Sequence, residues 1–135
     1  MAIPAQSLSG SEVLRCGSIN TQSGASSSTD SAFKFDGTPG TAGTDTHTVP
    51  ANHIITITNI IFCENGGNLE NFSLWAVSSS VESRLLTYSE LPAKATFSWN
   101  DRFSLIGGDK LLVNIEGTGP GNIDIWYSYI DQSWV

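Results

Sequence analysis

Two histidines are the residues best suited to chemistry in this chain, and they lie close together in the sequence. His47 and His53 flank the segment TVPAN, and Asp45 precedes them. Imidazole and carboxylate groups are common metal ligands. However, the metal-binding cupins place two histidines two residues apart on one strand, with a glutamate following. The spacing HTVPANH differs from that pattern, so it favours two exposed loop histidines, and we expect neither a metal nor a cofactor.

Catalysis by a nucleophile is not indicated either. A hydrolase triad needs Ser, His and an acid brought together, and serines are so abundant here that pairing them with two histidines carries little information. The GxSxG motif of a nucleophile elbow is absent. A glycosidase needs two carboxylates across a cleft, and the 13 scattered acids cannot be ranked for that role. We therefore expect that the chain is not an enzyme.

The two cysteines, Cys16 and Cys63, do not form a CxxC motif. In a reducing compartment two buried thiols are the simpler interpretation, and a disulfide between them stays an open alternative.

Aromatic side chains gather in the last two thirds of the chain. Exposed Trp and Tyr rings can stack on sugars, but rings of this kind more often fill a sandwich core or a subunit interface. Trp134 is a special case, because a tryptophan next to the last residue is hard to bury in its own sheet and easy to bury in a neighbour. The set is Trp75, Trp99, Trp126, Tyr127, Tyr129 and Trp134.

The net charge of −7 comes from 6 Lys and Arg against 13 Asp and Glu, and the positive residues are scattered singly. Binding to nucleic acid depends on Lys and Arg that neutralise phosphates, and binding to an anionic membrane depends on similar basic clusters. We therefore expect neither partner. The first residues lack the charged and apolar regions of a secretory signal, and no apolar run is long enough to span a membrane, so we expect synthesis in a cytoplasm.

The pattern of the chain changes near residue 48. Before it the sequence is rich in Ser, Thr and Gly, with apolar islands at EVLRCGSI (residues 12 to 19) and AFKFD (residues 32 to 36), each expected to form a short edge strand. After it, β-branched and aromatic residues alternate over segments separated by Gly turns, which predicts strands. The first of these strands is predicted to be central, with a bulge near Asn59, and ENGGN (residues 64 to 68) to close a hairpin.

Six or more short strands with no helical periodicity predict an all-β fold, an antiparallel β-sandwich or jelly-roll-like domain. The later strands are expected at residues 72 to 77, 83 to 91, 94 to 99, 110 to 117 and 123 to 130. We predict two parts: an extended N-terminal arm at residues 1 to 47 and a β-sandwich domain at residues 48 to 135.

The segments TVPANHIITITNIIFCENGGNLENFSLWAV and GDKLLVNIEGTGPGNIDIWYSYI, within residues 48 to 130, resemble the small all-β structural proteins of tailed bacteriophage virions. Those proteins show a VPA segment, an Ile-rich strand, a strand similar to SLWAV, a GD turn and a closing strand. This chain departs from the pattern at ELPAKATFSW, where a glycine-containing turn is usual, so the strand register there stays open.

The resemblance implies a virion component. Cement or decoration proteins of this kind are commonly trimers whose arms bind neighbouring shell subunits, so we expect a homotrimer on the major capsid protein or another virion protein. The alternative is a lectin-like tail or fibre module that binds host glycan. The residues expected to contact partners are Val13, Leu14, Ile19, Phe33, Phe35, Trp126, Tyr129 and Trp134.

Overall fold

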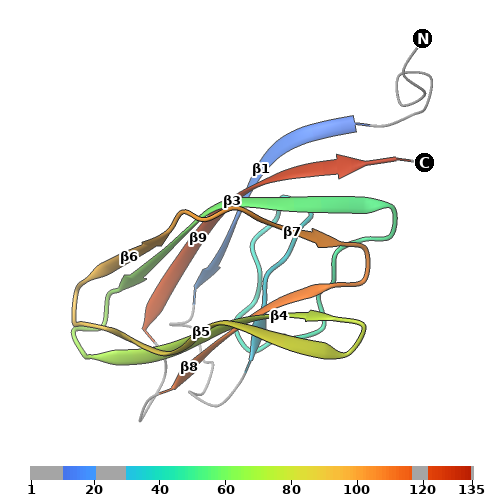
Figure 1. Ribbon diagram of the computed structural model, residues 1–135. Helices are drawn as coiled ribbons and strands as arrows, with labels where there is room; N and C mark the ends of the chain where they lie inside the picture. The colour runs from blue at the N-terminus through green and yellow to red at the C-terminus, as the bar shows by residue number, and fades with distance from the viewer. Residues whose placement is uncertain (1–10, 21–29, 117–121, 135) are drawn as a thin grey trace.

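Alternating apolar residues produce nine strands in the described part of the chain, and these strands form two antiparallel sheets packed face to face (Figure 1). The computed structural model describes residues 11–20, 30–116 and 122–134. No described helix is long and apolar enough to cross a membrane. The predicted antiparallel β-sandwich is confirmed.

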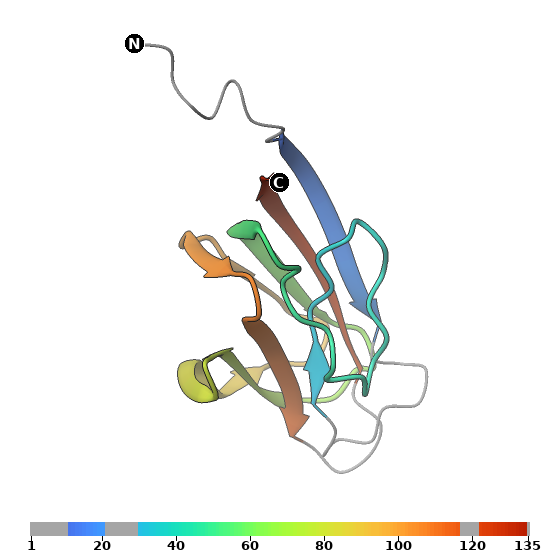
Figure 2. The same cartoon turned by 90° about the vertical axis from the view of Figure 1, so that its right-hand side faces the viewer.

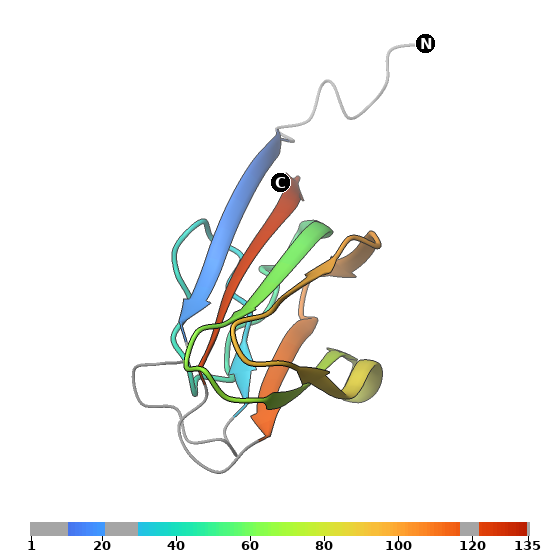
Figure 3. The same ribbon diagram turned by 90° about the vertical axis from the view of Figure 1, so that its left-hand side faces the viewer.

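The larger sheet has five strands, in the order β1-β9-β3-β6, with β7 also paired to β3. Its strands are β1 (Ser11–Asn20), β9 (Ile123–Ser133), β3 (His53–Glu64), β6 (Thr96–Trp99) and β7 (Phe103–Ile106). Figure 3 shows β1 at the margin of this sheet, next to β9. The first strand after residue 48 is therefore central, as predicted, because β3 lies between β9 and the short strands β6 and β7.

The smaller sheet has four strands, in the order β2-β8-β4-β5. Its strands are β2 (Ser31–Ala32), β8 (Lys110–Glu116), β4 (Glu70–Ser78) and β5 (Val81–Leu91). Early and late parts of the chain thus lie side by side in both sheets, which is compatible with the predicted jelly-roll arrangement. The strand β7 was not expected from the sequence, since its four residues carry no alternation long enough to detect.

A bulge in β3 decides which isoleucines enter the core. The pairing of β3 with β9 shifts between Ile57 and Asn59, as predicted near Asn59. Before the shift Ile55 and Ile57 point inward, and after it Ile60 and Phe62 do, so one extra residue brings residues of opposite parity to the same face. The bulge therefore explains why isoleucines of both parities occur in this strand.

Two buried tyrosines of β9 join the N-terminal third of the chain to the core. The hydroxyl of Tyr127 donates to the carbonyl of Lys34 at 2.5 Å and accepts the N–H of Lys34 at 2.9 Å. The hydroxyl of Tyr129 accepts the N–H of Gly37 at 2.9 Å. Burial raises the pKa of both tyrosines above the ordinary value, so both hydroxyls stay protonated and neutral.

The predicted N-terminal arm is not confirmed for the described residues before residue 48. β1 pairs with β9 over its whole length, and Phe33 and Phe35 are buried against Tyr127 and Tyr129. Figure 2 shows the segment that follows β2 on the side of the sandwich where β1 lies. The first apolar island forms the expected edge strand, β1, but the second does not, because β2 (Ser31–Ala32) ends at Ala32 and the rest of the island is not a strand. Ile19, Phe33 and Phe35 of these islands are buried in the core of their own domain rather than on a partner. Residues 1–10 and 21–29 of the predicted arm lie outside the described residues.

Gly17 of β1 lies against the ring of Tyr127. A Cβ atom at this position would lie 2.3 Å from Cζ of that ring, which is closer than two carbon atoms can approach. The absence of a side chain at residue 17 therefore lets Tyr127 reach across to Lys34.

Glu64 ends β3 and organises the ENGG turn that follows. Its buried carboxylate accepts the N–H groups of Gly66, Gly67 and Lys94 at 2.8 to 2.9 Å. Burial by itself would raise the pKa of Glu64, but the backbone N–H groups outweigh that effect and lower it. The neighbouring Glu70 has a raised pKa, through burial and the charge of Glu64. The predicted hairpin at this turn is wrong, because β3 belongs to the five-stranded sheet and β4 to the four-stranded sheet, so the turn carries the chain from one sheet to the other.

We predict that Gly17→Ala lowers the free energy of unfolding by about 2 kcal/mol or more, because overpacking moves the Tyr127 ring and weakens its bonds to Lys34. Denaturant unfolding followed by fluorescence measures the change. Ser18→Ala is the matched control and stays near the wild type. Equal stability of the two variants would contradict the role given to residue 17.

Glu64→Gln is expected to destabilise the fold at neutral pH, because an amide replaces a carboxylate that accepts three N–H groups. The folded-state pKa of Glu64 is lowered, so its contribution is complete above the ordinary value of 4.5 and is lost as the pH falls through the folded-state pKa. Unfolding curves of both proteins between neutral pH and about pH 3 test this. A stability difference that stays constant with pH would refute it.

Candidate interaction surface

The outer face of the five-stranded sheet is unusually apolar for a surface that no other described layer covers. Strands alternate their side chains, so the residues between the core positions of β1, β3, β9 and β7 point outward. Several of these are large and apolar, with Leu14 73%, Ile106 56% and Trp126 53% exposed. The apolar members of this outer face are Leu14, Ile54, Ile61, Ile106, Trp126 and Ile130.

The pairing registers bring these side chains into rows across the sheet. Trp126 of β9 lies between Ser18 of β1 and Ile61 of β3. Two rows further on, past the row of Cys16 and Ser128, Ile130 has Leu14 beside it on β1. Cross-strand neighbours lie about 5 Å apart, so the rows form a continuous surface.

Charge is nearly absent from this outer face. Among its strand positions only Glu12 and Asp124 are ionisable carboxylates, and they lie at opposite ends of the β1–β9 pair. Most of the acidic residues behind the net charge of −7 therefore lie elsewhere. Depletion of charge around exposed aromatic and aliphatic side chains is typical of the centre of a protein interface.

Trp126 borders a shallow hollow of about 300 Å³. Ile61 and Cys63 of β3 line one side of it, and Ser18 and Asn20 of β1 line the other. An aliphatic or aromatic side chain from another molecule would fit against this indole.

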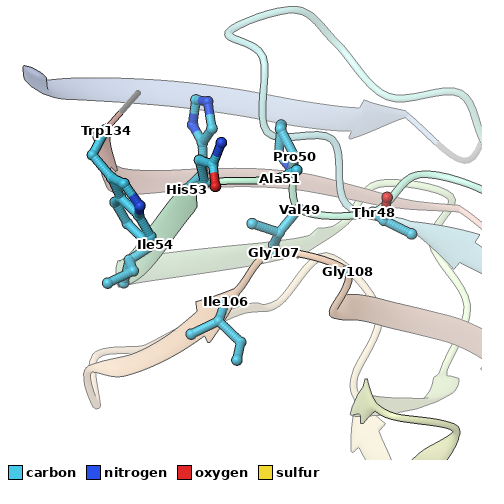
Figure 4. Close-up of a pocket in the computed structure, with 11 residues that line it drawn as sticks. Thr48, Val49, Pro50, Ala51, His53, Ile54, Ile106, Gly107, Gly108 and Trp134 are labelled. Atoms are coloured by element: carbon cyan, nitrogen blue, oxygen red, sulfur yellow. The ribbon is translucent and has the colours of Figure 1, made fainter. Parts of the chain in front are cut away.

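A second hollow, of about 650 Å³, lies at the end of the sandwich where β3 begins and the β7–β8 turn closes. Figure 4 shows Trp134 and Ile54 on one side of it and Ile106 on another. Trp134 is fixed there by its backbone N–H, which donates to the carbonyl of Asn52 at 3.1 Å. Trp134 is 43% exposed, so its own sheet leaves a large part of the ring uncovered, as expected.

His53 takes part in a charged cluster at the same end of the sheet. Its Nδ1 lies 2.6 Å from Oδ1 of Asp131, and Nε of Arg15 donates to Oδ2 of Asp131 at 3.2 Å. The carboxylate of Asp131 is buried, so these two partners satisfy it and tie β1, β3 and β9 together. The expectation that His53 is an exposed loop residue was wrong, because it begins β3 and binds Asp131. No group of three metal-binding side chains occurs in the described ranges.

The structure divides the eight expected contact residues into two sets. Four are exposed, with Leu14 and Trp126 on the outer face, Val13 on the opposite face of β1 and Trp134 after β9. The other four belong to the core and cannot meet a partner in this fold: Ile19, Phe33, Phe35 and Tyr129. Ile19, Phe33 and Phe35 were expected to contact partners because they lie in apolar islands of a polar segment, and Tyr129 because it belongs to the late aromatic set. Neither signal distinguishes an external partner from the chain's own core.

Sequence reasoning missed the isoleucines of the outer face. Ile54, Ile61 and Ile130 are half-buried, and Ile106 lies on the unexpected strand β7. A usable signal was present in β9, where Trp126 and Ile130 share the parity opposite to the core tyrosines.

The remaining tryptophans are not free to stack on a ligand in the way that Trp126 is. Trp75 is only 4% exposed, and the guanidinium of Arg84 covers its ring at 4.2 Å from the centroid. Trp99 is half-buried, packs edge-on against Phe103 and donates from Nε1 to the carbonyl of Asp101 at 2.8 Å.

Both cysteines are free thiols on the outer face. Cys16 pairs with Ser128 and Cys63 with Asp124, so the strand β9 separates them and their rows lie four residues apart. A disulfide needs Cα atoms within about 7 Å, and two strand spacings alone exceed that. The strand registers therefore exclude a Cys16–Cys63 disulfide. Both thiols were expected to be buried, but Cys16 is exposed and Cys63 is half-buried.

Comparison with known proteins adds little to this description. No protein family and no curated protein matches the sequence. Among solved structures, the fold is similar to a chain in the "Structure of infectious bursal disease virus Gx strain", with a TM-score of 0.36 and 10% identity, over 90% of this chain and 33% of that chain. The chain thus spans about a third of that protein's length. A TM-score of 0.36 is too low to assign a shared function.

We predict two free thiols per chain when the native protein is unfolded without reductant and titrated with a thiol reagent. Cys16→Ser gives one thiol in the same assay and serves as the control. A value near zero for the wild type would show a disulfide and would contradict the strand registers given above.

Proposed function

We propose that this protein is a structural component of a virion, and that it acts as a cement or decoration protein by binding the shell of major capsid protein through its outer face. The observation that carries the proposal is the apolar, nearly uncharged outer face around Trp126 and Leu14. The sequence resemblance to structural proteins of tailed bacteriophage virions supplies the class of partner.

The physical argument for a protein partner starts from solvation. Exposed contiguous apolar surface is costly in water, and a chain that keeps it gains stability when another surface covers it. Trp126 has the properties of an interface anchor, because it combines an exposed ring with a neighbouring hollow that a partner side chain can fill.

The distribution of charge supports the same function. Acidic residues away from the outer face keep many copies of a protein soluble before assembly, and they direct binding to the uncharged face. In this proposal the protein is made in the host cytoplasm and ends in the virion. Its partners are the major capsid protein or another virion protein and further copies of itself. The homotrimer expected from the resemblance stays a prediction.

A second function is favoured by one specific observation, the exposed indole of Trp126 beside its hollow. A lectin-like tail or fibre module would stack a host sugar on this ring. Trp75 and Trp99, which the same hypothesis would use, are covered by Arg84 and Phe103, so the glycan function depends on Trp126 and Trp134.

The test is binding of the purified chain to virion shells that lack it, measured by co-sedimentation. Trp126→Ser is expected to weaken binding about 30-fold, since a central aromatic anchor contributes about 2 kcal/mol or more. Tyr88→Ser is the matched control, because Tyr88 is an equally exposed aromatic (61%) on the other sheet, and it should bind as the wild type does.

Two results would overturn the capsid proposal. Either wild-type protein fails to bind shells, or both variants bind equally well. A change in tryptophan fluorescence on adding host polysaccharide, present in the wild type and absent in Trp126→Ser, would favour the glycan function instead.

A further inference from the structure

The strand β1 leaves part of its outer edge without a partner. All ten residues of β1 pair with β9 in one uninterrupted register, so its inner edge is fully used. On the outer edge, the carbonyl of Ser18 accepts the N–H of Gly40 at 2.8 Å. That bond covers the second half of the strand only, and Figure 3 shows no described segment beside the first half.

The bond to Gly40 fixes which backbone groups point outward. In an antiparallel pair, residues alternate between bonding the neighbour and pointing away from it. The backbone N–H and C=O groups of Ser18 point away from β9. The same groups of Glu12, Leu14 and Cys16 therefore point away from β9 too. Within residues 11–20, 30–116 and 122–134, no backbone group bonds the outward N–H and C=O groups of these three residues.

The other long edge strand, β5, shows how this fold protects an edge. Its pairing with β4 shifts register at Leu74, and Tyr88 has a positive φ of 48°, so the strand is irregular. It also carries the charged residues Glu82, Arg84 and Glu90. Irregularity and charge both discourage the addition of another strand. β1 lacks this irregularity over its first half, and its two charged residues there, Glu12 and Arg15, have opposite signs.

We propose that β1 pairs antiparallel with β1 of a second copy of this chain, about a two-fold axis at Leu14. In this register Leu14 faces Leu14 of the second copy, and Glu12 faces Cys16. Each chain then satisfies the outward backbone groups of the other, and the two five-stranded sheets become one continuous sheet.

A second copy meets no charge repulsion at this edge. Two chains of net charge −7 repel each other over most of their surfaces. β1 carries one Glu and one Arg, so it is neutral overall, and the proposed register places no two like charges opposite each other. Leu14, which is 73% exposed in one chain, becomes covered by its own copy.

This inference goes beyond the proposed function, because it concerns the edge of the sheet, and Leu14 is the apolar residue of the outer face that the two share. A two-fold contact produces a dimer, which is an alternative to the homotrimer expected from the resemblance. It also doubles the area of the outer face that is available to a shell.

The experiment is light scattering of the full chain at micromolar concentration, with two variants of similar chemistry. The wild type should have twice the 14.4 kDa mass of one chain. Leu14→Lys should be a folded monomer, because it places two positive charges across the axis. Val81→Lys, at a 65% exposed aliphatic residue of the protected edge strand β5, should remain a dimer.

A wild-type monomer or trimer overturns the inference, and so does a Leu14→Lys variant that remains a dimer. The register has its own test. Leu14→Cys, in a chain that also carries Cys16→Ser and Cys63→Ser, should form a disulfide-linked dimer on mild oxidation, since directly opposed residues lie within disulfide range. Failure to cross-link while the chain is dimeric would overturn the register about Leu14.

Discussion

The contact between the tyrosines of β9 and the segment after β2 determines how the rest of this structure is arranged. Tyr127 bonds both backbone groups of Lys34, and Tyr129 bonds the N–H of Gly37. These bonds satisfy polar groups that burial would otherwise leave unpaired, so Phe33 and Phe35 can enter the core with the backbone that carries them. The ring of Tyr127 also lies against Gly17, so it leaves no room for a side chain at this position of β1.

Two parts of the surface are protected from contact with other chains. The edge strand β5 is irregular and charged, and Trp75 on the smaller sheet is covered by Arg84. The outer face of the larger sheet has no such cover in the described residues, and the first half of β1 has an open edge. Both unprotected features belong to the same sheet and share Leu14, so pairing of two edges covers that residue and leaves Trp126 for binding through the face.

Much of the fold followed from the sequence, because alternation of apolar residues in β3, β4, β8 and β9 is strong and the Gly turns between them are clear. The bulge near Asn59 was also foreseeable, since the isoleucines of β3 change parity there. The role of the described residues among the first 47 could not be predicted. Phe33 and Phe35 are apolar residues in a polar segment, and sequence alone does not say whether their partner is another chain or the tyrosines of β9, more than ninety residues away. The outer face was predicted only in part, through Leu14 and Trp126, because the short strand β7 that carries Ile106 has no detectable pattern.

Residue-resolved amide hydrogen exchange tests the central claim most directly, namely that the described N-terminal part of the chain belongs to the sandwich, with β1 paired to β9 over its whole length. The account predicts that the amides of Gly17 and Ile19, which point toward β9, exchange as slowly as those of the central strand β3. Rapid exchange at Gly17 and Ile19, with slow exchange retained in β3, would show that the first strand detaches from the sandwich and would contradict the account.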